Sequence, residues 1–172
     1  YNGQMYESAG KYGQSDIRRV DIKQGFIKSR KELDAEYFAE GIAVLDDKIY
    51  QLTWKKQVGF IYDLKFNLLD TFHYDGQGWG ITTTNRENEL IMSDGTSKLR
   101  ILDVLNNMEV KSTHSVTYYD RINNKYKPLR KINELEYYNE YILANIWYDN
   151  RIAVIDPSNK FKPLNWVVLA IR

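Results

Sequence analysis

The stretch "GIAVLDDKIYQLTW" (residues 41–54), followed by "GFIYDLKFNLLDTF" (59–72), contains four short apolar segments separated by polar residues. Asp46 and Asp47 separate the first two segments, and Asp63 precedes the last one. Short segments rich in β-branched and aromatic residues, with Asp at the breaks between them, are typical of antiparallel strands joined by turns. This part of the chain therefore predicts one sheet of four strands.

The same layout recurs along the chain. Its first half matches "GITTTNRENELIMSD" (80–94) and "ELEYYNEYILANIWY" (134–148). Its second half matches "DIRRVDIKQGFIKSRKEL" (16–33), "KLRILDVLNNMEVKST" (98–113) and "RIAVIDPSNKFKPLNWV" (151–167). In each copy an aspartate follows the first strand of the pair: Asp21, Asp63, Asp103 and Asp156. Four short strands in roughly 40 residues are the signature of a β-propeller blade, and a β-sandwich is the alternative.

The repeat count predicts an all-β fold with a single propeller domain over residues 1–172. Three full units and one partial unit come to about four blades at most. A propeller closes into a ring, because an open one leaves unpaired strand edges. We therefore expect the domain to be incomplete at its C-terminus.

The composition gives no support to several function classes. Lys and Arg number 24 against 23 Asp and Glu, so no strong field favours nucleic acid. No cysteine is present, and the longest apolar run, "WVVLAI", is too short to span a bilayer. His73 and His114 have no partner at metal-ligand or triad spacing. We expect a monomer without metal or other cofactor, without a membrane span and without a nucleic-acid partner.

A candidate site follows from the repeat. In a propeller, the first strands of the blades line the central channel, so the residues that begin them gather at one mouth. Glu40, Trp79 and Asn133 precede first strands, and Trp54, Asp94 and Trp147 end second strands. A lone Trp at a strand end is more often packing, but several beside one carboxylate indicate a ligand pocket. Burial beside indoles would raise the pKa of Glu40 and suit it to acid–base chemistry.

Six stretches carry a resemblance to a known family: "YESAGKYGQSDIRRVD" (6–21), "FAEGIAVLDDKIYQLTW" (38–54), "GWGITT" (78–83), "LIMSDGTSKL" (90–99), "INELEY" (132–137) and "ANIWYDNRIAVIDP" (144–157). In these the chain resembles the glutamine cyclotransferases, the plant and bacterial type of glutaminyl-peptide cyclotransferase. Ala39 and the insertion at 113–128 depart from the family pattern, and the family's C-terminal lysine segment has no counterpart here.

The resemblance implies a five-bladed propeller that converts the N-terminal glutamine of peptides or proteins to pyroglutamate without a metal, outside the cytoplasm. The family's catalytic glutamate falls on Glu40. Its substrate-binding residues fall on Tyr12, Gln14, Trp54, Trp79, Asn133 and Trp147.

Two other functions remain open from the residues. A calcium-dependent propeller lactonase or hydrolase would use Glu40, Asn133 and Asp94 as oxygen ligands. A propeller without catalytic activity would bind peptide N-termini or a partner protein instead.

Overall fold

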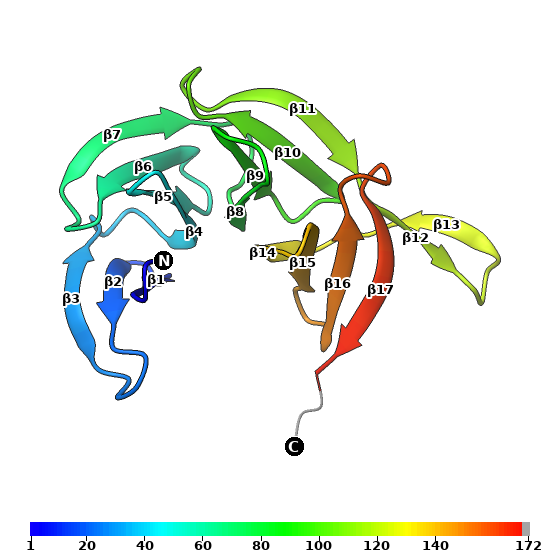
Figure 1. Ribbon diagram of the computed structural model, residues 1–172, viewed down its shortest axis with the longest axis horizontal. Coiled ribbons are helices and arrows are strands. Elements are labelled where there is room, and N and C mark those ends of the chain that lie inside the picture. Colours follow the sequence, from blue (N-terminus) through cyan, green and yellow to red (C-terminus); the bar gives the residue numbers. More distant parts are fainter. Residues whose placement is uncertain (170–172) are drawn as a thin grey trace. The chain divides into compact units, whose positions relative to one another are not determined.

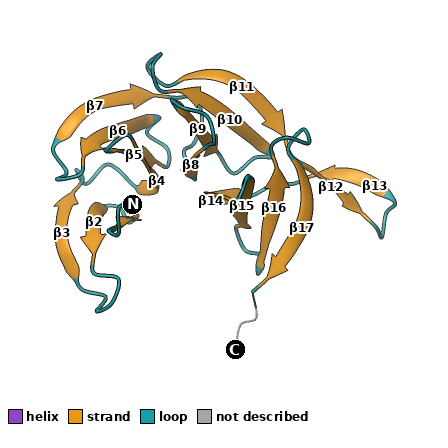
Figure 2. Ribbon diagram, in the orientation of Figure 1, coloured by secondary structure: helices purple, strands orange, loops and turns teal. Residues whose placement is uncertain are grey.

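The computed structural model describes residues 1–169, and these form strands joined by turns and loops, without a helix (Figures 1 and 2). The prediction of an all-β protein is confirmed. The described part of the chain accordingly has no helix long and apolar enough to cross a membrane.

The chain divides into two compact units, and the first comprises Tyr1–Gly78. It contains two antiparallel sheets, each a meander in sequence order. The three-stranded sheet consists of β1 (Met5–Ala9), β2 (Asp16–Val20) and β3 (Ile27–Glu32). The four-stranded sheet consists of β4 (Ala39–Leu45), β5 (Lys48–Thr53), β6 (Val58–Asp63) and β7 (Leu68–His73). The second sheet has the four strands that the opening stretch predicts.

The second unit begins at Trp79 and contains two more four-stranded meanders. One consists of β8 (Ile81–Thr83), β9 (Glu89–Ser93), β10 (Lys98–Asp103) and β11 (Glu109–Ser115). The other consists of β14 (Ile132–Tyr138), β15 (Tyr141–Ile146), β16 (Arg151–Asp156) and β17 (Lys162–Val168). Between them, residues 117–128 of the 113–128 insertion form a separate hairpin of β12 (Thr117–Asp120) and β13 (Lys125–Pro128), and the first three residues of the insertion end β11.

The repeated aspartates act as turn caps. Oδ1 of Asp63 accepts hydrogen bonds of 2.8 Å from the backbone N–H groups of Lys65 and Asn67. Asp21, Asp103 and Asp156 accept from the backbone of the next turn in the same way. An Asp side chain that bonds the backbone two residues on stabilises such turns. The sequence period therefore reflects one turn chemistry used between the third and fourth strand of a meander, or between β2 and β3.

Each unit has a core of its own. In the first, Ile17, Ile49, Tyr62 and Phe66 are buried together, which joins the two sheets. In the second, β9 and β10 contribute Ile91, Leu99 and Ile101 to a cluster with residues of β14–β16. Val116 and Leu129, which flank the hairpin, belong to the same cluster. Burial of these apolar side chains supplies the main favourable term for packing the sheets.

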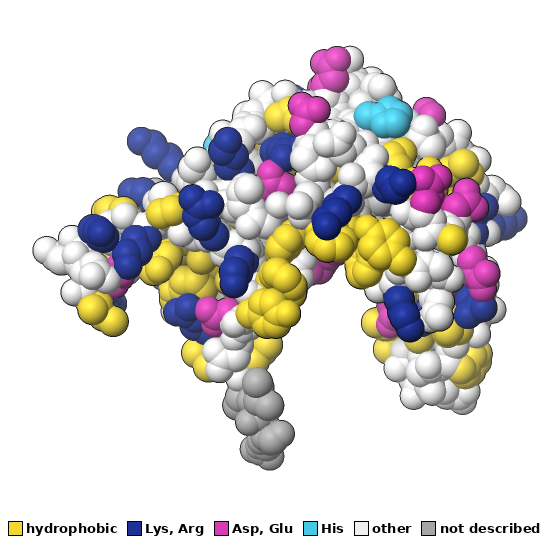
Figure 3. All heavy atoms as spheres, turned by 180° about the vertical axis from the view of Figure 1, so that it is seen from behind, with side chains coloured by type: hydrophobic (Ala, Val, Ile, Leu, Met, Phe, Trp, Pro, Cys, Tyr) yellow, Lys and Arg dark blue, Asp and Glu magenta, His cyan; other side chains and the backbone are white. Residues whose placement is uncertain are grey.

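The charged side chains are distributed over the surface. On the face drawn in Figure 3, lysine and arginine (dark blue) are interspersed with aspartate and glutamate (magenta). The picture agrees with the near balance of 24 basic and 23 acidic residues.

Candidate functional site

Glu40 lies in a β-bulge at the beginning of β4. Ala39 pairs with Thr53 but Ile42 pairs with Gln51, so the register shifts by one residue at Glu40–Gly41. A bulge locally re-aims a side chain relative to the regular pleat. Glu40 is half-buried, and burial raises the pKa of its carboxyl to about 7. A carboxyl with a pKa near neutrality can both accept and return a proton at neutral pH.

The raised pKa of Glu40 predicts a pH-dependent effect of Glu40→Gln on stability. The unfolded carboxyl has a pKa of about 4.3, so from there to about 7 the folded protein binds more protons and loses stability as pH rises. We expect Glu40→Gln to raise the Tm at about pH 8 and to change it much less at about pH 4. Thermal melts of both proteins at the two pH values measure this. The exposed Glu87→Gln serves as control, and an equal pH response in the two variants would contradict the assignment.

The loop between β1 and β2 is tied to the residue before Glu40. Ser15 is buried, and its Oγ accepts hydrogen bonds from the backbone N–H of Ala39 at 3.1 Å and of Lys11 at 3.0 Å. The hydroxyl donates in turn to the carbonyl oxygen of Lys11 at 2.9 Å. A Cβ on Gly10 would lie 2.2 Å from the Ala39 oxygen, so glycine permits this close approach. The loop that carries Tyr12 and Gln14 is thereby held against the start of β4.

A row of three aromatic rings begins in this loop at Tyr12. Tyr12 packs edge-on against Phe38 with ring centroids 5.3 Å apart, and Phe38 packs against Trp54 at 5.6 Å. The indole N–H of Trp54 donates to Oε1 of Gln77 at 2.7 Å. Lys55 places its Nζ 3.8 Å from the centre of the Trp54 ring. The structure thus brings Tyr12 and Trp54 together through Phe38, a residue that the sequence-based list omits.

Gln14 has a different setting. It is exposed, and its backbone N–H donates to the carbonyl of Lys11 at 2.9 Å, which closes the loop. No hydrogen bond of its side chain occurs among those described for residues 1–169, so its amide is available at the surface of the first unit.

The second unit repeats the bulge at the two other predicted positions. Trp79 donates its backbone N–H to Ser93 O at 3.1 Å, and Gly80 O accepts from Ser93 N at 2.9 Å, so two residues oppose one. In β14, the register shifts between Ile132 and Leu135, at Asn133–Glu134. Glu40, Trp79 and Asn133 therefore occupy the same place in three sheets.

Ser93 connects the starts of β8 and β14. Its buried Oγ accepts from the backbone N–H of Gly80 at 2.8 Å and donates to the carbonyl oxygen of Asn133 at 2.7 Å. Like Ser15, Ser93 joins two backbone segments through one hydroxyl, although Ser15 lies in the loop before β2 and Ser93 ends β9. The sequence does not mark either serine as a structural residue, because each bonds a segment that is distant along the chain.

Trp79 and Trp147 form the aromatic part of the second unit. Their ring centroids lie 5.5 Å apart at 86°, and a Cβ on Gly95 would come within 2.5 Å of the Trp79 ring. The ring centroids of Trp147 and Tyr148 lie 4.4 Å apart. The Nζ of Lys131 lies 5.6 Å from the centroid of the Tyr148 ring. Trp147 is 46% exposed and Tyr148 is 83% exposed. Tyr148 is a second neighbour that the sequence-based list omits.

Asp94 is engaged in local contacts. Its carboxylate accepts hydrogen bonds from Thr96 N and Oγ1 and pairs with Arg100 at 2.5 Å. Within residues 1–169 no group of three or more His, Asp or Glu side chains is placed to hold a metal ion.

Comparisons with known proteins identify relatives of the chain as a whole. A family model described as glutamine cyclotransferase matches residues 1–164. A curated glutaminyl-peptide cyclotransferase of Arabidopsis thaliana is 36% identical over 171 residues, which are 98% of this chain and 50% of that protein. The chain thus spans about half the length of this curated relative.

Solved structures give the fold. The crystal structure of Myxococcus xanthus glutaminyl cyclase superposes with a TM-score of 0.83 at 26% identity, covering 97% of this chain and 67% of that one. The WD40 domain of Neurospora crassa Pan2 aligns with a TM-score of 0.61 at 11% identity, over 98% of this chain and 47% of that one, and supports the fold alone. The prediction of a β-propeller is confirmed, and its four sheets of three or four strands, β12–β13 aside, match the expectation of about four blades.

Proposed function

The chain belongs to the glutamine cyclotransferase family, and from this premise we propose that the protein cyclises the N-terminal glutamine of peptides to pyroglutamate and releases ammonia, with Glu40 as acid–base catalyst. The observation that carries the proposal is the half-buried carboxyl of Glu40, whose pKa is about 7, two residues after Phe38, which packs against Trp54.

The reaction needs little more than positioning and proton transfer. The α-amine of the substrate attacks the carbon of its own side-chain carboxamide, which forms one C–N bond and finally breaks the other. Because both groups belong to one residue, a fixed rotamer supplies an effective molarity that reaches about 10⁵ M or more in well-oriented cases. The α-amine has a pKa of about 7.7–8.0, so a useful neutral fraction exists at pH 7.

Glu40 accounts for the proton balance. Its carboxylate accepts a proton from the attacking amine, and the resulting acid returns it to the departing nitrogen, which leaves as ammonia. One carboxyl with a pKa near the working pH can do both, and such catalysis contributes typically ~10²–10⁴-fold.

The remaining site residues are proposed to bind the substrate: Tyr12, Gln14, Trp54, Trp79, Asn133 and Trp147. The indoles would hold the glutaminyl stem and exclude water, so that cyclisation prevails over hydrolysis. The amide groups of Gln14 and Asn133 would donate to the carboxamide oxygen as negative charge develops on it. Support comes from the pairing of Trp79 with Trp147 and from the tie between the Tyr12 loop and β4.

The proposal predicts a mass change in a defined peptide. Incubation of a Gln-initiated peptide with the full-length protein is expected to lower the peptide mass by about 17 Da, one ammonia, through the intramolecular reaction described above. Mass spectrometry measures this directly. An Asn-initiated peptide, whose shorter side chain would close a strained four-membered ring, serves as control.

Two further outcomes decide between functions. An unchanged rate in EDTA is expected, whereas loss with EDTA and recovery with calcium would favour a calcium-dependent enzyme. No mass change at any enzyme concentration would overturn the proposed activity.

A further inference from the structure

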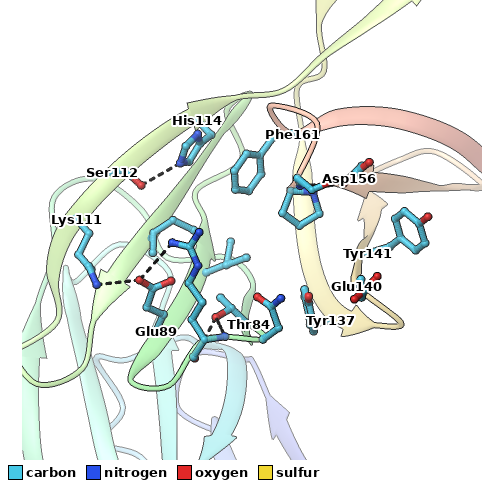
Figure 4. Close-up of a pocket in the computed structure, with 16 residues that line it drawn as sticks. Thr84, Glu89, Lys111, Ser112, His114, Tyr137, Glu140, Tyr141, Asp156 and Phe161 are labelled. Atoms are coloured by element: carbon cyan, nitrogen blue, oxygen red, sulfur yellow. Dashed lines mark hydrogen bonds and ion pairs between the residues drawn. The ribbon is translucent and has the colours of Figure 1, made fainter.

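A cavity of about 560 Å³ lies in the second unit, between the sheet of β8–β11 and the sheet of β14–β17 (Figure 4). Thr84, just beyond β8, and Tyr137, at the end of β14, contribute to its walls. Trp79 and Asn133 lie at the opposite ends of these two strands, and none of the proposed catalytic or substrate-binding residues lines the cavity. Its volume is in the range of pockets that hold small organic ligands.

The inner part of the cavity is apolar and uncharged. Ile91, Ile101 and Phe161 line it and are buried. The imidazole of His114 stacks on the Phe161 ring, with ring centroids 4.0 Å apart and an angle of 19° between the ring planes. Nε2 of His114 lies 2.9 Å from Ser112 Oγ. Burial lowers the pKa of His114, so its ring is neutral near pH 7. This surface suits an apolar side chain of a ligand.

One wall carries an excess of positive charge. The carboxylate of Glu89 is 7% exposed, with Lys111 Nζ at 2.8 Å and Arg86 Nη1 at 3.9 Å. Two cations thus share one carboxylate. The Arg86 side chain is 76% exposed and lies 3.9 Å at its nearest from Glu89, so it has further N–H donors for an anion of a ligand at this wall.

The other wall carries an excess of negative charge. Glu140 forms no hydrogen bond or ion pair among those described for residues 1–169, and it lies beside Tyr137 and Tyr141 (Figure 4). Asp156, on the same side, is held ionised because the hydrogen bond from Ser158 lowers its pKa. A carboxylate flanked by phenol rings is a favourable environment for an ammonium group.

From these two walls and the apolar surface between them, we propose that the cavity binds a zwitterionic ligand of dipeptide size with an apolar side chain. Its carboxylate lies against Arg86 and Lys111, its ammonium against Glu140 between the two tyrosines, and its side chain on Phe161 and the two isoleucines. The site is independent of the proposed cyclisation, since it shares no residue with it.

The test uses the dipeptide leucyl-phenylalanine as probe and calorimetric titration of the full-length protein. Saturable binding with a Kd of about 1 mM or tighter is expected. The N-acetylated dipeptide and the C-terminal amide each lack one charge, and each is expected to bind at least about tenfold more weakly, the equivalent of one lost charged contact of about 1.4 kcal/mol. A titration without saturable binding would overturn the proposal, and so would equal affinity for either blocked dipeptide.

Matched variants assign the two ends of the ligand. Glu140→Gln is expected to weaken binding of the dipeptide about tenfold and to leave binding of the N-acetylated form unchanged. Arg86→Gln is expected to weaken binding of the dipeptide about tenfold and to leave binding of the C-terminal amide unchanged. Glu136→Gln and Arg121→Gln change the same charges at exposed positions outside the cavity and should leave affinity unchanged. Unchanged affinity in either cavity variant contradicts the assignment of that wall.

Discussion

Glu40→Gln is expected to lower kcat for cyclisation of a Gln-initiated peptide by about 10²–10⁴-fold, the usual contribution of general acid–base catalysis. The variant keeps the size and polarity of the side chain but cannot accept a proton. Because the amide occupies the same bulge in β4, binding of the substrate should persist and KM should change little. Steady-state kinetics on the purified variant measure both constants.

The pH profile separates a catalytic role from a structural one. In the wild-type protein kcat/KM should rise with an inflection near pH 7, because Glu40 with its pKa of about 7 acts first as a base. The residual activity of Glu40→Gln should lack this inflection. Glu36→Gln, which removes an exposed carboxylate that pairs with Lys56, is the control and should behave as wild type. Near-wild-type turnover by Glu40→Gln would rule out the proposed role.

The strands and turns of this protein were predictable because they depend on local sequence. Asp63 bonds the backbone of its own turn, and Asp46 and Asp47 form a two-residue turn between Leu45 and Lys48, with φ of 50° and 56°. Left-handed backbone is tolerated best by Gly, Asn and Asp. Interactions that span a few residues leave a repeated pattern that can be read along the chain.

The support of the candidate site was not predictable in the same way. Ser15 bonds Ala39, and Ser93 bonds the carbonyl of Asn133, so each contact joins segments far apart in the chain. A serine carries no sequence signal that distinguishes such a bridge from an exposed hydroxyl. Phe38 could have been considered from the sequence, because it lies two residues before Glu40 in the stretch "FAEG". Only the structure shows that its ring packs between those of Tyr12 and Trp54.

The two serine bridges have a common consequence. Ser15 bonds Ala39, the residue beside the bulge at Glu40–Gly41. Ser93 bonds Gly80 and Asn133, which are themselves bulge residues. A site residue is positioned more accurately when the backbone that carries it is constrained by a buried hydrogen bond. The geometry of Glu40 therefore depends on a hydrogen bond, from Ala39 N–H to Ser15 Oγ, that does not involve Glu40 itself.

Gly80→Ala is expected to have the second large effect, because it disturbs the contact between Gly80 and Asn133 that the Ser93 hydroxyl bridges. A Cβ at this position would lie 2.3 Å from the carbonyl oxygen of Asn133 and 2.7 Å from the Cα of Glu134. These are backbone atoms, so the two strands must separate, at the cost of about 1–3 kcal/mol that overpacking usually carries. The Ser93 bridge between Gly80 and Asn133 would lengthen, and Trp79 would shift against Trp147.

Three measurements follow from this displacement: a lower Tm, a changed near-UV circular dichroism signal from the Trp79–Trp147 pair, and a higher KM for the peptide. Gly25→Ala is the control, since a Cβ there meets nothing within 4 Å and φ is +72°. Left-handed strain costs that variant roughly 1–2 kcal/mol, so its Tm falls while the near-UV signal and KM stay as in wild type. The near-UV signal reports on the two indoles even if no peptide is turned over. A Gly80→Ala protein that kept this signal and the wild-type KM would show that the close approach of Gly80 to Asn133 does not position either residue.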